Sequence, residues 1–117
     1  MKTNYLFAGL AVRDLATARK WYERFFGRPP DMIPNEREVV WRVAETGSLY
    51  VVVDPARAGR SLVTLIVDDL SATIALLNKR DMTVGPVERF AGNAKAVIVD
   101  PDGNTIALAE IGTPLEE

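Results

Sequence analysis

Acid–base or metal chemistry in this 117-residue chain must rest on carboxylates, amines, hydroxyls or bound water, because the sequence contains neither histidine nor cysteine. Histidine is the most common metal ligand and the usual general base near neutral pH. Cysteine would be needed for a thiolate nucleophile or a disulfide. The candidates that remain in the predicted strands are the carboxylates of Asp54, Glu88 and Glu110 and the hydroxyl of Thr64. Carboxylates at strand ends also occur as ordinary surface residues, which is the alternative interpretation.

Three aromatic residues are candidates for binding an organic ligand. Phe7 could stack on a planar group, or it could fill space in the core or in a dimer interface. Trp41 is followed by Arg42, and this pair suits a flat or anionic ligand, although a buried structural tryptophan is also common. Phe90 precedes a predicted turn at 91–93 and could overhang a binding site, stand exposed on a hairpin or contact a second subunit.

Other conspicuous residues are explained by local structure. Asp14 and Asp69 each stand between a strand-like segment and a helical segment, where an aspartate caps the helix N-terminus. Asp100 and Asp102 belong to a turn-forming sequence. We assign Trp21 to helix packing.

The composition is that of an ordinary globular protein, with 48% hydrophobic and 26% charged residues. The length predicts one domain. A net charge of −2 argues against nucleic-acid binding. The apolar runs are too short to cross a bilayer, and no secretory signal pattern precedes the first predicted strand, so we expect no membrane association and a cytoplasmic location.

An internal repeat organises the chain. Residues 7–15 and 62–70 align at an offset of 55 (62 minus 7), which matches Leu10 with Leu65, Val12 with Val67, Asp14 with Asp69 and Leu15 with Leu70. Each segment alternates like a strand before its aspartate and becomes helical after it. We expect helices at about 15–26, ended by Gly27, and 70–80.

The remaining pattern predicts strands. They are expected near 31–34 and at 38–44, 48–53, 83–90, 94–99 and 104–110. The order is βαβββ followed by βαβββ, an α+β fold. We expect a single domain over 1–117, with one module at about 4–54, a linker at 55–60 and a second module at about 61–111.

Two motifs carry a resemblance to a known family. The stretch Leu10–Leu15 with the helix end Trp21–Gly27, and the Asp-Pro-Asp-Gly-Asn turn at 100–104 leading into 105–108, resemble the glyoxalase/bleomycin-resistance (vicinal oxygen chelate) superfamily. The match covers nearly the whole chain, and the turn is its most specific part. The resemblance implies tandem βαβββ modules that form a curved mixed sheet around a cleft, usually in a homodimer.

The resemblance also implies where a metal ion would bind in metal-dependent members. Carried over, the four ligand positions are Phe7, Leu62, Ala107 and Val51, and none of these side chains can donate an electron pair to a metal. Strand alternation predicts that Tyr5, Phe7, Gly9 and Ala11 share one face, and that Leu62, Thr64 and Ile66 share another. We therefore expect no metal, no cofactor and an apolar cleft.

Three functions follow as hypotheses. The first is a metal-independent, non-catalytic protein that holds a small, partly aromatic organic molecule in clefts of a homodimer. The second is a lyase, isomerase or dioxygenase-type enzyme that uses Asp54, Glu88 or Glu110 for metal or base. The third is an accessory domain with a collapsed cleft. For the first hypothesis, the predicted ligand-binding residues are Phe7, Trp41, Val51, Leu62, Thr64, Phe90 and Ala107, with no catalytic residue.

Overall fold

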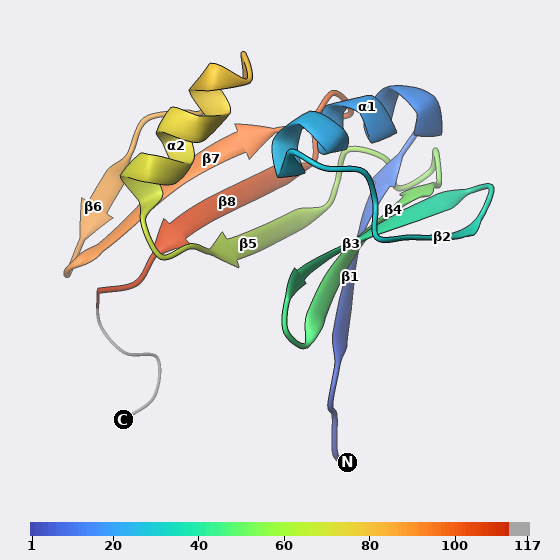
Figure 1. Ribbon diagram of the computed structural model, residues 1–117, viewed down its shortest axis with the longest axis horizontal. Helices are drawn as coiled ribbons and strands as arrows, with labels where there is room; N and C mark the ends of the chain where they lie inside the picture. Colours follow the sequence, from blue (N-terminus) through green and yellow to red (C-terminus); the bar gives the residue numbers. More distant parts are fainter. Residues whose placement is uncertain (113–117) are drawn as a thin grey trace. The chain divides into compact units, whose positions relative to one another are not determined.

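The computed structural model describes residues 1–112, and the chain divides into two compact units (Figure 1). Unit 1 consists of Met1–Ser61 together with Asp100–Asn104. Unit 2 consists of Leu62–Val99 and the chain from Thr105 onward. The last five residues of the expected 1–117 domain lie outside the described part.

Unit 1 contains one βαβββ module. Its elements are β1 (Leu6–Val12), α1 (Leu15–Phe26), β2 (Met32–Asn35), β3 (Glu38–Ala44) and β4 (Gly47–Val53). The strands form one sheet in the order β1-β4-β3-β2, in which β1 and β4 are parallel and the other pairs are antiparallel. The elements lie within a residue or two of their predicted positions.

Unit 2 repeats this architecture. Its elements are β5 (Leu62–Ile66), α2 (Leu70–Lys79), β6 (Glu88–Phe90), β7 (Asn93–Val99) and β8 (Thr105–Glu110), and its sheet has the matching order β5-β8-β7-β6. The predicted tandem βαβββ fold is confirmed. The strand expected over 83–90 is wrong in its first half, because only 88–90 pair with β7. Pro86 lacks the N–H that a sheet ladder requires.

The predicted caps of both helices are confirmed. Asp14 accepts a hydrogen bond from the backbone N–H of Thr17, and Asp69 accepts one from Ala72, each at 2.9 Å. The hydrogen bonds from Thr17 hold the pKa of Asp14 below its usual value. Gly27 ends α1 with a φ of 73°, a left-handed conformation that glycine adopts without strain.

An aromatic layer fills the space between α1 and the sheet of unit 1. Trp41, on β3, is fully buried, and its ring centroid lies 5.2 Å from that of Phe26 and 6.0 Å from that of Tyr22. The indole Nε1–H of Trp41 donates to the carbonyl of Arg28 at 3.1 Å. The polar end of this tryptophan is therefore satisfied inside the core.

The turn between β7 and β8 belongs to unit 1, where its side chains are extensively bonded. The buried carboxylate of Asp100 accepts hydrogen bonds from the hydroxyl of Tyr22 at 2.7 Å and from Nδ2 of Asn104 at 2.8 Å. Asn104 also donates to the carbonyl of Ala11 and accepts from the backbone N–H of Ser61. The predicted turn residues thus also hold α1 and the end of β1.

Within residues 1–112, neither helix has the length and apolar character that crossing a membrane would demand.

The buried Tyr22 hydroxyl predicts a loss of stability at alkaline pH. Burial and the neighbouring Asp100 carboxylate raise the pKa of Tyr22 well above its usual value of 10.0. Above that pH the unfolded chain releases a proton that the folded protein retains, so the free energy of unfolding should fall by about 1.4 kcal/mol per pH unit. Tyr22→Phe removes this proton release. When the free energy of unfolding is measured with urea between pH 8 and pH 11, it should fall less steeply with pH for the variant than for the wild type. Equal slopes for the two proteins would contradict this role of Tyr22.

Candidate functional site

The strand register of unit 1 determines which residues face α1 and which face away. Leu10 lies opposite Val51, and Val51 lies opposite Val39, so these three buried residues share the face that α1 covers. Phe7 lies opposite Ser48, three residues earlier on each strand, and an odd number of residues in a strand means that it points to the other face. The predicted common face of Phe7, Gly9 and Ala11 is confirmed.

Three rings gather on the face turned away from α1, and we call Tyr5, Phe7 and Tyr50 the aromatic surface. The centroid of Phe7 lies 5.0 Å from that of Tyr5 and 6.5 Å from that of Tyr50, and both ring pairs are tilted. Phe7 is 51% exposed. The hydroxyls of Tyr5 and Ser48 are hydrogen-bonded to each other at 2.6 Å. The arrangement offers a partly exposed aromatic platform with hydroxyls beside it.

Gly9 makes room for the third ring. A β-carbon at this position would lie 2.6 Å from Cζ of Tyr50 and 2.7 Å from its hydroxyl oxygen. Gly9 also lies directly opposite Tyr50 in the ladder. The absence of a side chain at residue 9 therefore allows the Tyr50 ring to lie over β1.

Trp41 and Val51 do not lie on the predicted binding surface, and we correct their placement. Both are fully buried on the face that α1 covers. The choice of Val51 was wrong by one residue, which in a strand exchanges the two faces. In unit 2, Leu62 lies opposite Thr105, and Ala107 comes two residues later. Phe7 is the counterpart of Leu62 in the repeat, and its ladder partner is Ser48. The residue two positions after Ser48 is Tyr50, so Tyr50 and not Val51 corresponds to Ala107.

Trp41 and Arg42 also do not act as a pair. They are adjacent on β3 and therefore point to opposite faces. The guanidinium of Arg42 donates to the carbonyls of Ala44 and Glu45 in the turn that follows β3.

In unit 2, the face turned away from α2 carries the other predicted residues. Leu62, Thr64 and Ile66 alternate as exposed positions on β5, which confirms their common face, and Thr64 lies opposite the buried Ala107. Phe90 is exposed at the end of β6. On this face β5 carries two apolar side chains and the hydroxyl of Thr64, whereas Glu88 on β6 and Lys95 on β7 add charged groups.

The candidate carboxylates are not arranged as one ligand set. Glu110 accepts a hydrogen bond from the backbone N–H of Leu70 at 2.8 Å, so it binds the N-terminus of α2. Glu88 lies opposite Lys95 in the ladder, and Lys95 lies opposite Ala109, which places Glu88 on the other face from Glu110. In unit 1, Asp54 lies 3.8 Å from the guanidinium of Arg57.

The donor chemistry at the four positions implied by the family resemblance does not fit a divalent metal. Phe7, Leu62 and Ala107 end in carbon, and the corrected fourth position supplies only the phenol of Tyr50. Several oxygen or nitrogen ligands are needed for such an ion. Residues 1–112 contain no group of three or more aspartates or glutamates that could hold a metal ion.

Sequence reasoning missed Ser48 and Tyr50. The signal was present in β4, where Leu49, Val51 and Val53 alternate with Ser48, Tyr50 and Val52. The purely aliphatic set suits the helix-covered face, and the set with two hydroxyls suits the open face.

No family model and no curated protein matches this chain. A search of solved structures does find similar proteins. A crystal structure of a glyoxalase/bleomycin resistance protein from Catenulispora acidiphila is 39% identical, with a TM-score of 0.87, and the match covers 93% of this chain and 99% of that one.

Two further structures share the fold at lower identity. TnmS3, an antibiotic-binding protein from Streptomyces sp. CB03234, is 23% identical, with a TM-score of 0.76, and the match covers 93% of this chain and 96% of that one. A bleomycin-binding protein in complex with bleomycin is 20% identical, with the same TM-score, and the match covers 93% of this chain and 99% of that one.

The close approach at Gly9 predicts a specific effect of substitution. Gly9→Ala should displace the Tyr50 ring and lower the free energy of unfolding by about 1–3 kcal/mol, as is typical of overpacking. Gly47→Ala is the matched control, because its β-carbon would meet no atom closer than 3.8 Å. Urea unfolding and the nuclear Overhauser contacts between Phe7 and Tyr50 measure both effects. Unchanged ring contacts in Gly9→Ala would show that Gly9 does not position Tyr50.

Proposed function

Because this chain belongs to the glyoxalase/bleomycin resistance family, we propose that it is a metal-independent binding protein for a small, partly aromatic organic molecule. Relatives that share its fold include an antibiotic-binding protein and a protein that binds bleomycin. The observation that carries the proposal is the aromatic surface, which stands at the position where metal-dependent members are expected to hold their first ligand.

The aromatic surface supports binding of a planar ligand. Phe7 is half exposed between two other rings, so a ligand ring can pack against it without first displacing core residues. A pair of aromatic rings contributes about 0.5–1.5 kcal/mol beyond the area that it buries. The hydroxyls of Tyr5 and Ser48 are already bonded to each other, which fixes the Tyr5 ring beside Phe7. The phenol of Tyr50 adds a hydrogen-bonding group for a polar substituent of the ligand.

We propose that unit 2 also contributes to ligand binding. Its candidate residues are Leu62, Thr64 and Ala107 on the face turned away from α2, and Phe90 on β6. A mainly apolar surface with few polar groups is typical of binding sites for small organic molecules.

We further propose that the chain forms a homodimer. Leu62 and Val99 both lie beside Thr105 in the ladder, and with Ile66 they form an exposed apolar patch on β5 and β7. Their exposed fractions are 73% for Leu62, 52% for Val99 and 53% for Ile66. Patches of this kind mark interaction sites in soluble proteins, and a second copy of the chain would bury its apolar groups beside the ligand that Thr64 and Ala107 contact. The native mass of the assembly tests this proposal.

The binding proposal is tested with N-phenyl-1-naphthylamine, a neutral aromatic dye whose fluorescence rises in apolar surroundings. The wild-type protein should bind the dye saturably. Phe7→Ala should raise the dissociation constant about tenfold, which corresponds to the loss of a good aromatic contact. Leu76→Ala, which removes another half-exposed apolar side chain from α2, should leave the dissociation constant unchanged. Equal affinity in the wild type and Phe7→Ala would contradict binding at the aromatic surface.

A further inference from the structure

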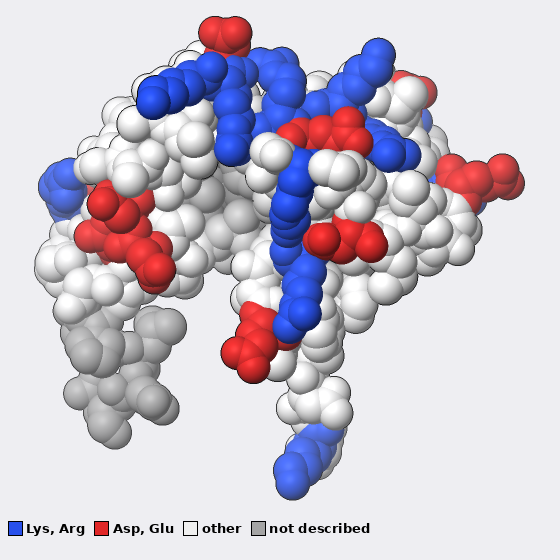
Figure 2. Space-filling model, viewed as in Figure 1, with Lys and Arg blue, Asp and Glu red and all other residues white. Residues whose placement is uncertain are grey.

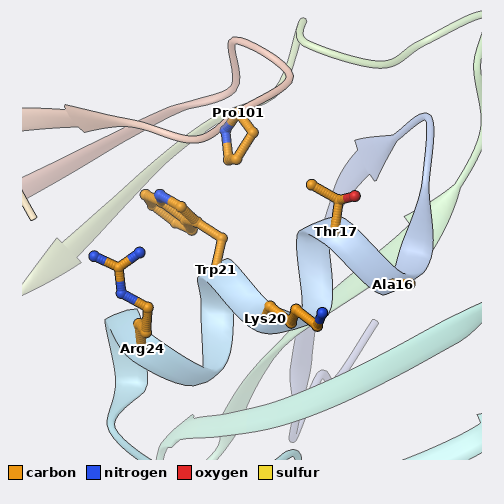
Figure 3. A pocket seen from close by; sticks show the side chains of 6 residues that line it. All are labelled: Ala16, Thr17, Lys20, Trp21, Arg24 and Pro101. Atoms are coloured by element: carbon orange, nitrogen blue, oxygen red, sulfur yellow. The ribbon is translucent and has the colours of Figure 1, made fainter.

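A second candidate site, which we call the second pocket, lies in unit 1 on the outer side of α1, and therefore across the sheet from the aromatic surface. Its volume is about 300 Å³, and its lining residues are Ala16, Thr17, Lys20, Trp21, Arg24 and Pro101 (Figure 3). The five helical residues follow one another at steps of one, three, one and three along one side of α1. The proposed function does not use this pocket.

Trp21 gives the pocket an aromatic wall. Its indole ring is stacked on the buried ring of Phe25, with an angle of 8° between the planes and 5.4 Å between the centroids. Figure 3 shows Trp21 and the methyl group of Thr17 on two sides of the pocket, with Pro101 opposite the helix. The indole Nε1–H of Trp21, unlike that of Trp41, has no hydrogen-bond partner among residues 1–112. It is therefore available to a ligand.

Lys20 supplies a positive charge at this pocket. No ion pair joins Lys20 to any residue in the described part of the chain. The neighbouring Arg19 does not line the pocket, and its guanidinium is paired with Glu23 at 3.1 Å. Figure 2 shows Lys and Arg side chains around α1, with acidic side chains between them. An anion would be attracted to the side of the pocket where Lys20 lies.

Pro101 is held in place independently of any ligand. It follows Asp100, whose buried carboxylate is bonded to the hydroxyl of Tyr22 on α1. The proline ring also restricts the backbone at residue 101. The pocket is thus formed before binding, which reduces the entropy cost of holding a small ligand.

From these features we propose that the pocket binds a small aromatic carboxylate. The ligand ring would lie against Trp21 and Pro101, and its carboxylate would accept a hydrogen bond from Lys20. The volume is at the lower end of the range for small-molecule sites, which suits a ligand with one or two rings rather than a larger molecule.

Benzoate is the probe for this proposal, and the indole N–H signals of the two tryptophans report its position. The Trp21 signal is assigned from the spectrum of Trp21→Phe. Benzoate should shift the Trp21 signal saturably, with a dissociation constant in the millimolar range, and should leave the signal of the buried Trp41 in place. Benzyl alcohol, which lacks the charge, and acetate, which lacks the ring, should each bind more weakly. Equal binding of benzyl alcohol and benzoate, or no shift of the Trp21 signal, would overturn the proposal.

Two variants that each remove one positive charge from α1 separate this pocket from a general charge effect. Lys20→Gln should weaken benzoate binding by about threefold, as expected for a partly exposed ion pair. Arg19→Gln should leave it unchanged, because Arg19 is outside the pocket. Equal weakening in both variants would overturn the proposal. Because N-phenyl-1-naphthylamine is neutral, its binding at the aromatic surface should be the same in Lys20→Gln as in the wild type, so the two proposals fail separately.

Discussion

The hydrogen bond from the Tyr22 hydroxyl to the buried carboxylate of Asp100 joins two parts of unit 1 that are 78 residues apart in the sequence. Tyr22 also packs its ring against Trp41, so one side chain connects α1 both to the sheet and to the turn. Asp100 in turn accepts from Asn104, which is bonded to the carbonyl of Ala11 at the end of β1. A buried carboxylate is stable only when such donors surround it, and removing one of them leaves a costly unpaired group.

This fixed position of α1 determines the two faces of unit 1. The helix covers the face that carries Trp41 and Val51, and the pleat of the sheet then places Phe7 and Tyr50 on the opposite face. The same bond holds Pro101 at the outer side of α1, where the second pocket lies. The aromatic surface and the second pocket therefore depend on one packing arrangement, although they lie on different sides of it.

Much of the fold could be predicted from the sequence because its signals are local. Asp14 and Gly27 act within one helical turn, and the repeat identifies both modules without any tertiary information. The aromatic surface was harder to predict, because Tyr50 and Val51 are neighbours and only the pairing of β4 with β1 decides which one faces away from α1. The role of Asp100 beyond its turn was also not visible, since its partner Tyr22 is distant in sequence.

We propose that the aromatic surface of this family member binds an organic molecule where metal-dependent relatives are expected to bind a metal. Native mass spectrometry of the protein as purified, before and after dialysis against a chelator, distinguishes the two kinds of ligand. We expect the mass of a dimer, with bound mass that belongs to an organic molecule and is unchanged by the chelator. A stoichiometric divalent metal that remains bound after dialysis would contradict the proposal.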